Sequence, residues 1–165
     1  MPDQNKDIKL QNLDIFALLR LEHLSEEEKL KRLSQIQQIV LTDFINTDLP
    51  NYLKDEEIER LEKMVEEKAA PDKIEGFLRE KISDFDLILA KKFLEFKRQL
   101  VGQNMQTRLD LNKKQIEQVK EGELTEEKSS VLAQLQAQKE ILEKILADIK
   151  QDNWSQVDRL VQELV

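Results

Sequence analysis

The 165-residue sequence contains no cysteine, one histidine (His23), three glycines and three prolines. The absence of cysteine excludes disulfide bonds, thiol catalysis and cysteine-ligated metal sites. A single histidine excludes most histidine-based metal sites and disfavours a Ser-His triad. The isolated Gly76, Gly102 and Gly122 exclude a phosphate-binding loop, which needs several glycines within a short span. So few glycines and prolines also argue against a turn-rich β fold.

Long hydrophobic runs are missing as well. No segment approaches 18 apolar residues, so we expect no membrane span. The first ten residues, MPDQNKDIKL, lack the apolar core of a signal peptide, and we therefore expect a cytoplasmic protein. Charged residues make up 36% of the chain and apolar residues only 39%, which is typical of a slim helical protein with much surface per residue.

Charge is distributed unevenly along the chain, whose formal net charge is −8. Residues 1–70 carry 10 Lys and Arg against 16 Asp and Glu, residues 71–115 carry 10 against 7, and residues 116–165 carry 6 against 11. A mildly basic middle between two acidic flanks predicts that the acidic segments fold back on the basic one.

Helical periodicity dominates the first 100 residues. We expect a first helix over about 11–23. Ser25-Glu26-Glu27-Glu28 forms a capping box and predicts a second helix that ends near Asn46. Asp55 is the predicted cap of a third helix, and Pro71 suits the first turn of a fourth. No segment alternates with the period of two that a strand requires.

A long helix is predicted over about 84–121, and we expect it to continue through Gly102 with a kink. Its two apolar stripes are out of register: Phe85, Leu89, Phe93, Phe96 and Leu100, then Met105, Leu109, Asn112, Ile116 and Val119. Gly122 is its predicted end, and Thr125 the predicted cap of the next helix. That helix carries the most regular heptad of the chain, at Val131, Leu135, Gln138, Leu142, Ile145 and Ile149.

The predicted fold is therefore all-α, in two parts that share the long helix. Residues 1–100 form a compact helical bundle, with Phe16, Phe44, Phe77, Phe85, Phe93 and Phe96 inside. Residues 101–165 form an antiparallel, coiled-coil-like hairpin. A short last helix beginning at Trp154 folds back to cover it.

The residues capable of chemistry are scattered. His23 is expected at the end of the first helix, where it complements the helix dipole, and Arg20 three residues earlier excludes a Glu-x-x-His di-iron motif. The acidic clusters 26–28, 55–57 and 126–127 coincide with predicted helix starts. We therefore expect no catalytic residue, metal, cofactor or small-molecule substrate.

The sequence instead favours a non-catalytic protein-interaction module, such as an adaptor, scaffold or chaperone. Its partner would be another protein or a second copy of the chain in a homodimer. The candidate contact residues are Trp154 and the hairpin residues Leu135, Leu142, Ile145 and Ile149. A structural role, in which Trp154 and the last helix seal the hairpin, is the alternative, and for Trp154 it is the preferred one.

Two alternatives involve nucleic acid. The basic stretch 91–114 predicts a nucleic-acid-associated regulator that uses Lys91, Lys92, Lys97, Arg98, Arg108, Lys113 and Lys114. The net charge of −8 disfavours this function, because it repels a polyanion at long range. The carboxylate-rich helices also suit an acidic inhibitor that mimics nucleic acid.

Part of the chain resembles a known group of proteins. The motifs are Leu24 to Lys29, Phe44 to Pro50, Leu53 to Glu57, Pro71 with Phe77-Leu78, and Phe93 to Lys97. Over residues 13–100 they resemble short all-helical bacterial domains of unknown function. The resemblance implies a helical fold and no activity. The hairpin after residue 100 is similar, at the level of fold, to helical export chaperones and coiled adaptor proteins.

Overall fold

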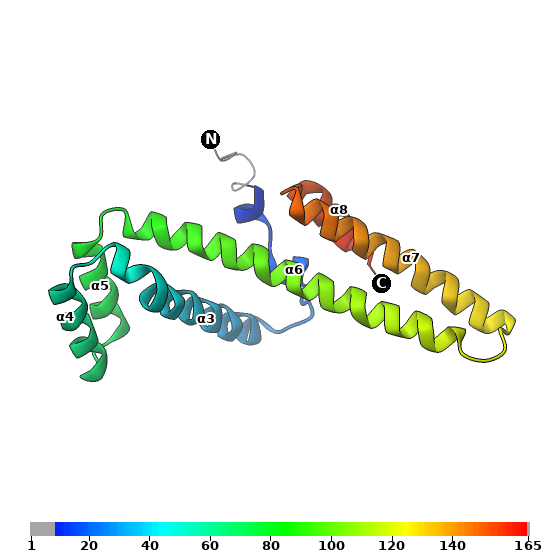
Figure 1. Ribbon diagram of the computed structural model, residues 1–165, viewed down its shortest axis with the longest axis horizontal. Helices are drawn as coiled ribbons and strands as arrows, with labels where there is room; N and C mark the ends of the chain where they lie inside the picture. Colours follow the sequence, from blue (N-terminus) through cyan, green and yellow to red (C-terminus); the bar gives the residue numbers. More distant parts are fainter. Residues whose placement is uncertain (1–8, 165) are drawn as a thin grey trace. The chain divides into compact units, whose positions relative to one another are not determined.

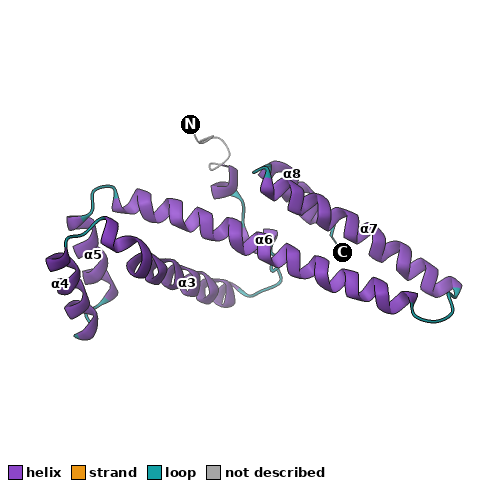
Figure 2. Ribbon diagram, in the orientation of Figure 1, coloured by secondary structure: helices purple, strands orange, loops and turns teal. Residues whose placement is uncertain are grey.

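The protein is all-α over residues 9–164, the part of the chain that the computed structural model describes (Figures 1 and 2). This confirms the predicted fold class. The elements are α2 (Ile15–Leu18), α3 (Glu26–Asp43), η1 (Phe44–Asp48), η2 (Leu49–Asn51), α4 (Asp55–Glu66), α5 (Pro71–Lys81), α6 (Phe85–Lys120), α7 (Glu126–Lys150) and α8 (Trp154–Gln162). None of the helices in this range is both long and apolar enough to cross a bilayer.

The chain divides into two compact units that share α6. Unit 2 spans Ser25–Phe96, whereas unit 1 combines the described part of the first 24 residues with the chain from Lys97 onward. The N-terminal segment thus groups with the chain that follows Lys97. The predicted domains, 1–100 and 101–165, stay a prediction.

Unit 2 is built around one apolar core. The core consists of Phe44, Leu49, Leu53, Leu61, Phe77, Leu78, Ile82 and Phe85. Phe44 meets the edge of Phe85 with ring centroids 5.6 Å apart, and Tyr52 stacks on Phe44 at 6.0 Å. Three of the six predicted interior phenylalanines are thus core residues of this unit, whereas Phe93 and Phe96 are only half-buried.

Unit 1 contains the helical hairpin. Helix α7 packs against α6 and against α8, as predicted. The hairpin core includes Met105 and Ile145, both with no exposed surface, and α8 buries Trp154, Val157, Leu160 and Val161 on it. The N-terminal segment adds Phe16 and the fully buried Leu10 and Leu18 to the buried residues of this unit.

The helix starts test the capping predictions directly. Ser25 caps α3, since its hydroxyl accepts from the Glu28 amide at 3.3 Å and the Glu28 carboxylate accepts from the Ser25 amide at 2.9 Å. Pro71 opens α5, and Thr125 accepts from the Lys128 amide at the start of α7. These three predictions are confirmed.

Two boundaries were predicted wrongly. The Lys54 position, and not Asp55, caps α4: the Lys54 amide donates to the Glu57 carboxylate at 3.0 Å, which leaves Asp55 as the first helical residue. The helix expected over 11–23 is interrupted, because Asp14 accepts from the Phe16 amide at 2.9 Å and starts α2 afresh. It also ends early, since Arg20 adopts a left-handed φ of 58°.

Helix α6 runs without interruption through Gly102, as predicted. The kink expected there stays a prediction. Gly122 follows the end of α6 with a left-handed φ of 88°, a conformation that glycine adopts without steric penalty. Gly102 has no such requirement, because a methyl group added to it would lie 4.0 Å from the Ile149 side chain, at ordinary contact distance.

Gly102→Ala should therefore raise the free energy of unfolding by about 1 kcal/mol, because alanine restricts the unfolded chain and favours the helix. Gly122→Ala should lower it by about 1 kcal/mol, because its φ disfavours a Cβ atom. Urea unfolding monitored by circular dichroism measures both. If Gly102→Ala were less stable than the parent, α6 would not be a continuous helix with room for a methyl group at residue 102.

Candidate functional site

A π-helix clamped by one lysine is the most unusual local feature of unit 2. The π-helix η1 directly continues α3, and the Leu49 amide after it donates to the Phe44 carbonyl. From α6, the Lys92 ammonium reaches both ends of this turn, pairing with the Asp43 carboxylate at 2.8 Å and with the Asp48 carboxylate. The Thr47 hydroxyl adds a bond to the Asp43 carbonyl at 2.5 Å. Such π-turns are rare and occur often at functional sites.

The electrostatics of this clamp favour the charged forms of its members. Hydrogen bonds from Lys92 and then Thr47 lower the pKa of the Asp43 carboxyl below its usual 3.8. Burial lowers the pKa of Lys92, but the hydrogen bonds and charges of Asp43 and Asp48 outweigh burial and raise that pKa above 10.5. Asp43 and Lys92 are therefore both ionised throughout the neutral range.

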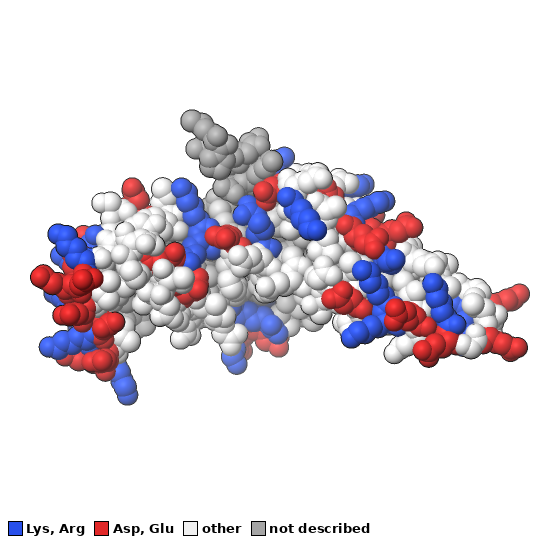
Figure 3. Space-filling view, in the orientation of Figure 1, with Lys and Arg blue, Asp and Glu red and all other residues white. Residues whose placement is uncertain are grey.

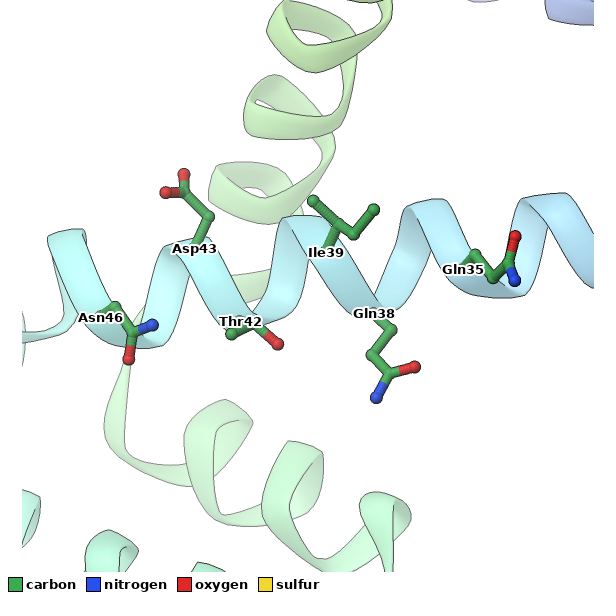
Figure 4. Close-up of a pocket in the computed structure, with 6 residues that line it drawn as sticks. All are labelled: Gln35, Gln38, Ile39, Thr42, Asp43 and Asn46. Atoms are coloured by element: carbon green, nitrogen blue, oxygen red, sulfur yellow. The ribbon is translucent and has the colours of Figure 1, made fainter.

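The outer face of α3 is largely uncovered. Of its 18 residues only Val40 is buried, while Leu30 is 66% exposed and Ile39 52% exposed. Figure 4 shows the end of this face, where α3 runs into η1. Gln38, Thr42 and Asn46 project to one side of the helix and Ile39 to the other, and together with Gln35 and Asp43 they line a shallow, open depression.

A deeper groove of about 620 Å³ lies between η1, η2 and α4, and Asn46 lines it as well. Its apolar lining is Ile45, Leu49, Pro50, Ile58, Leu61 and Val65. The charged lining residues are Glu62 and Glu66. We call this feature the α4 groove. All its residues belong to unit 2, and Leu49 and Leu61 are also core residues.

Four of the seven cations predicted to bind nucleic acid are used inside the molecule. Lys92 clamps η1, and Arg98 pairs with Asp152 at 2.8 Å. Lys97 is buried and donates to the carbonyls of Leu10, at 2.7 Å, and of Leu13. Arg108 donates to the Leu19 carbonyl at 3.2 Å. Burial lowers the pKa of Lys97, against the attraction of Asp14, which raises it.

The remaining three predicted cations, Lys91, Lys113 and Lys114, are exposed. The other four bind carbonyls and carboxylates of their own unit. On the face of the molecule seen in Figure 3, Lys and Arg side chains are interspersed with Asp and Glu side chains over α4 and α5, so the acidic residues there form no purely acidic surface.

The predicted protein-binding residues lie mostly inside unit 1. Trp154 and Ile145 have no exposed surface, Leu142 and Ile149 are buried, and Leu135 is half-buried. Trp154 donates its indole N–H to Asp152 at 3.2 Å, at the corner where α7 turns into α8. Leu135 and Leu142 also line a small open cavity of about 280 Å³ on the hairpin, together with Asn112 and Leu164. The placement of the four buried side chains corresponds to the structural alternative, in which the last helix seals the hairpin.

The remaining candidates occupy ordinary structural positions. His23 is exposed in the turn before α3, so it does not end a helix as predicted, because α2 stops at Leu18. The three acidic clusters lie in the first turns of α3, α4 and α7, where they complement the helix dipoles as predicted. Within residues 9–164, no group of three or more acidic or histidine side chains is arranged to hold a metal ion.

Sequence reasoning missed the α4 groove and the π-helix. Helical periodicity places the groove residues Ile58 and Leu61 on one apolar stripe, and the sequence of that stripe does not show which of its residues stay uncovered. The one available signal was Pro50, which ends the helical run and creates the short η2 turn that forms one wall.

Comparison with protein-family models, with curated proteins and with solved structures found no match. The resemblance of residues 13–100 to helical bacterial domains consequently assigns no family and no function to this chain.

Replacing Trp154 with alanine should lower the free energy of unfolding by about 3–5 kcal/mol, because the variant leaves a large cavity under α8. Trp154→Phe should lose less. Chemical denaturation measures both, and Val131→Ala, at a 41% exposed site on α7, should change stability by less than about 0.5 kcal/mol. A Trp154→Ala variant as stable as the parent would show that this side chain does not hold the hairpin.

Replacing Lys92 with methionine should destabilise unit 2 in a pH-dependent way. Asp43 has a lowered pKa in the folded chain, so its contribution is present above pH 3.8 and is lost as the pH falls through the folded value. Lys92 has a raised pKa, so its contribution is present below pH 10.5 and is lost as the pH rises through the folded value.

The stability difference between the parent and Lys92→Met should therefore be constant at neutral pH and shrink at both extremes. Urea titrations across pH measure it, with Lys91→Met as the control at the exposed neighbouring lysine. A difference that does not change with pH would mean that the clamp acts by packing and not by charge.

Proposed function

We propose that this chain is a non-catalytic protein-interaction module that binds its partner on unit 2. The single observation that carries the proposal is the exposed Ile39 of α3, which lines an open depression where α3 runs into η1. An 18-residue helix of a globular protein usually buries an apolar stripe against its own core, and tertiary packing supplies most of its stability. Here Val40 is buried and Leu33, Ile36 and Leu41 are half-buried, whereas Ile39 exposes more than half of its surface.

The neighbouring polar groups suit protein recognition. Gln35, Gln38, Thr42 and Asn46 line the same open depression as Ile39, so a chain bound there would meet hydrogen-bonding groups as well as one apolar side chain. Protein interfaces combine these groups in the same way, with an apolar centre and a polar rim. The helix is anchored at its C-terminal end by Phe44 in the core and by the Lys92 clamp, so this face is held in place before a partner arrives.

The position of the cations supports this function over a nucleic-acid role. Phosphate binding requires free cations, and Lys92, Lys97, Arg98 and Arg108 are already bound to groups of their own unit. The proposal differs from the sequence-based prediction in its location, since it uses α3 and not the hairpin residues around Trp154.

Site-specific photo-crosslinking tests this function. A benzoylphenylalanine introduced at Ile39 should form a discrete, reproducible protein adduct in the native host cell, identified by mass spectrometry. The matched control is the same group at Gln37, an exposed position on α3 that lines no described cavity. An identical pattern of adducts at the two positions, or none at either, would contradict the proposed function.

A further inference from the structure

The α4 groove has a preformed apolar floor. Leu49 and Leu61 are 3% and 1% exposed because they also belong to the core, and Ile45 and Ile58 pack against that core. Val65, by contrast, is 50% exposed on the open side. A floor continuous with the core cannot collapse to fill the groove, because protein interiors are tightly packed and resist deformation. The groove is thus open and ready for apolar side chains.

The charged residues that line the α4 groove are all negative. Its only charged lining residues are Glu62 and Glu66, which lie four residues apart on the same side of α4. Like charges at this spacing disfavour the helix. Neither carboxylate forms an ion pair with any residue of the described chain 9–164. Unit 2 as a whole is also negatively charged, since Ser25–Phe96 holds 12 Lys and Arg against 18 Asp and Glu.

The length of the groove limits what it can hold. Its α4 side extends from Ile58 to Glu66, which at 1.5 Å per residue is about 12 Å, or roughly two helical turns. Two turns of a bound helix present two or three apolar side chains at spacings of three and four residues. Helices that dock into apolar grooves are recognised through this pattern.

On this basis, and resting on the proposed protein-interaction function, we propose that the α4 groove binds a basic amphipathic helix of a partner protein. The apolar side chains of that helix lie on Ile58, Leu61 and Val65. Its Lys or Arg side chains pair with Glu62 and Glu66 at the rim. Phosphate-bearing occupants, such as nucleic acid or anionic lipid, are disfavoured by the same two carboxylates.

The test uses the full chain and a labelled 18-residue helical peptide of leucine and lysine, with a leucine and glutamate peptide of the same apolar pattern as its counterpart. Fluorescence anisotropy should show binding of the lysine peptide that weakens with added salt. The glutamate peptide should bind at least roughly tenfold more weakly, because its charges meet carboxylates of the same sign.

The double variant Glu62→Lys and Glu66→Lys should weaken binding of the lysine peptide by roughly tenfold or more. The matched control is Glu56→Lys with Glu67→Lys, which makes the same change in net charge on exposed positions at the two ends of α4 that do not line the groove. That control should alter the dissociation constant by less than about twofold. Circular dichroism and urea midpoints establish that both variants remain folded.

Equal losses in the two double variants would show that net charge alone attracts the peptide, and would overturn the proposal. Absence of binding, or equal binding of both peptides, would overturn it as well. So would concentration-dependent dimerisation abolished only by the groove variant, since the occupant would then be a second copy. A crosslink at Ile39 that persists when the peptide test fails would leave the interaction function standing and remove only the groove assignment.

Discussion

One lysine bridges the two ends of the π-helix in unit 2. Lys92 of α6 lies between the carboxylates at the two ends of the π-helix, Asp43 and Asp48, and holds α3 and η1 against the core. The widened π-turn places Asn46 and Ile45 toward α4 and sets up the short η2 turn that completes the groove wall. A regular helical turn would rotate these side chains by a substantial angle, because a π-helix contains more residues per turn than an α-helix. The groove wall and the end of the α3 face both adjoin this ion cluster.

The same use of cations recurs in unit 1. Lys97 and Arg108 bind backbone carbonyls of the N-terminal segment, and Arg98 binds Asp152 at the corner before α8. Backbone carbonyls at the ends of short helices have no partner within the helix, so a charged donor from α6 satisfies them. Four cations from the basic middle of the sequence thus make stabilising contacts within their own units. Among the contacts in unit 1, only Arg98–Asp152 joins the basic middle to an acidic residue, because the acceptors of Lys97 and Arg108 are the backbone oxygens of Leu10, Leu13 and Leu19.

Local chemistry accounts for what the sequence could predict. Ser25, Pro71, Gly122 and Thr125 each act within a few residues of their own position, so their roles follow from the sequence without knowledge of the fold. The hydrogen-bond acceptor of Lys97 cannot be predicted from the local sequence, because Leu10 is 87 residues away. Likewise, the heptad around Ile145 predicts that an apolar face exists but not what covers it. The exposure of Ile39 on α3 and the π-helix could not be predicted from periodicity either, because both depend on contacts between residues that are distant in the sequence.

The central claim is that Lys92 holds the π-turn. Amide hydrogen exchange at Leu49, whose N–H donates to the Phe44 carbonyl across the turn, reports on it directly. In Lys92→Met, exchange at Leu49 should accelerate several-fold, while the Leu61 amide in the middle of α4 keeps its protection. Unchanged exchange at Leu49 in that variant would contradict the account, because the turn would then be maintained without the clamp.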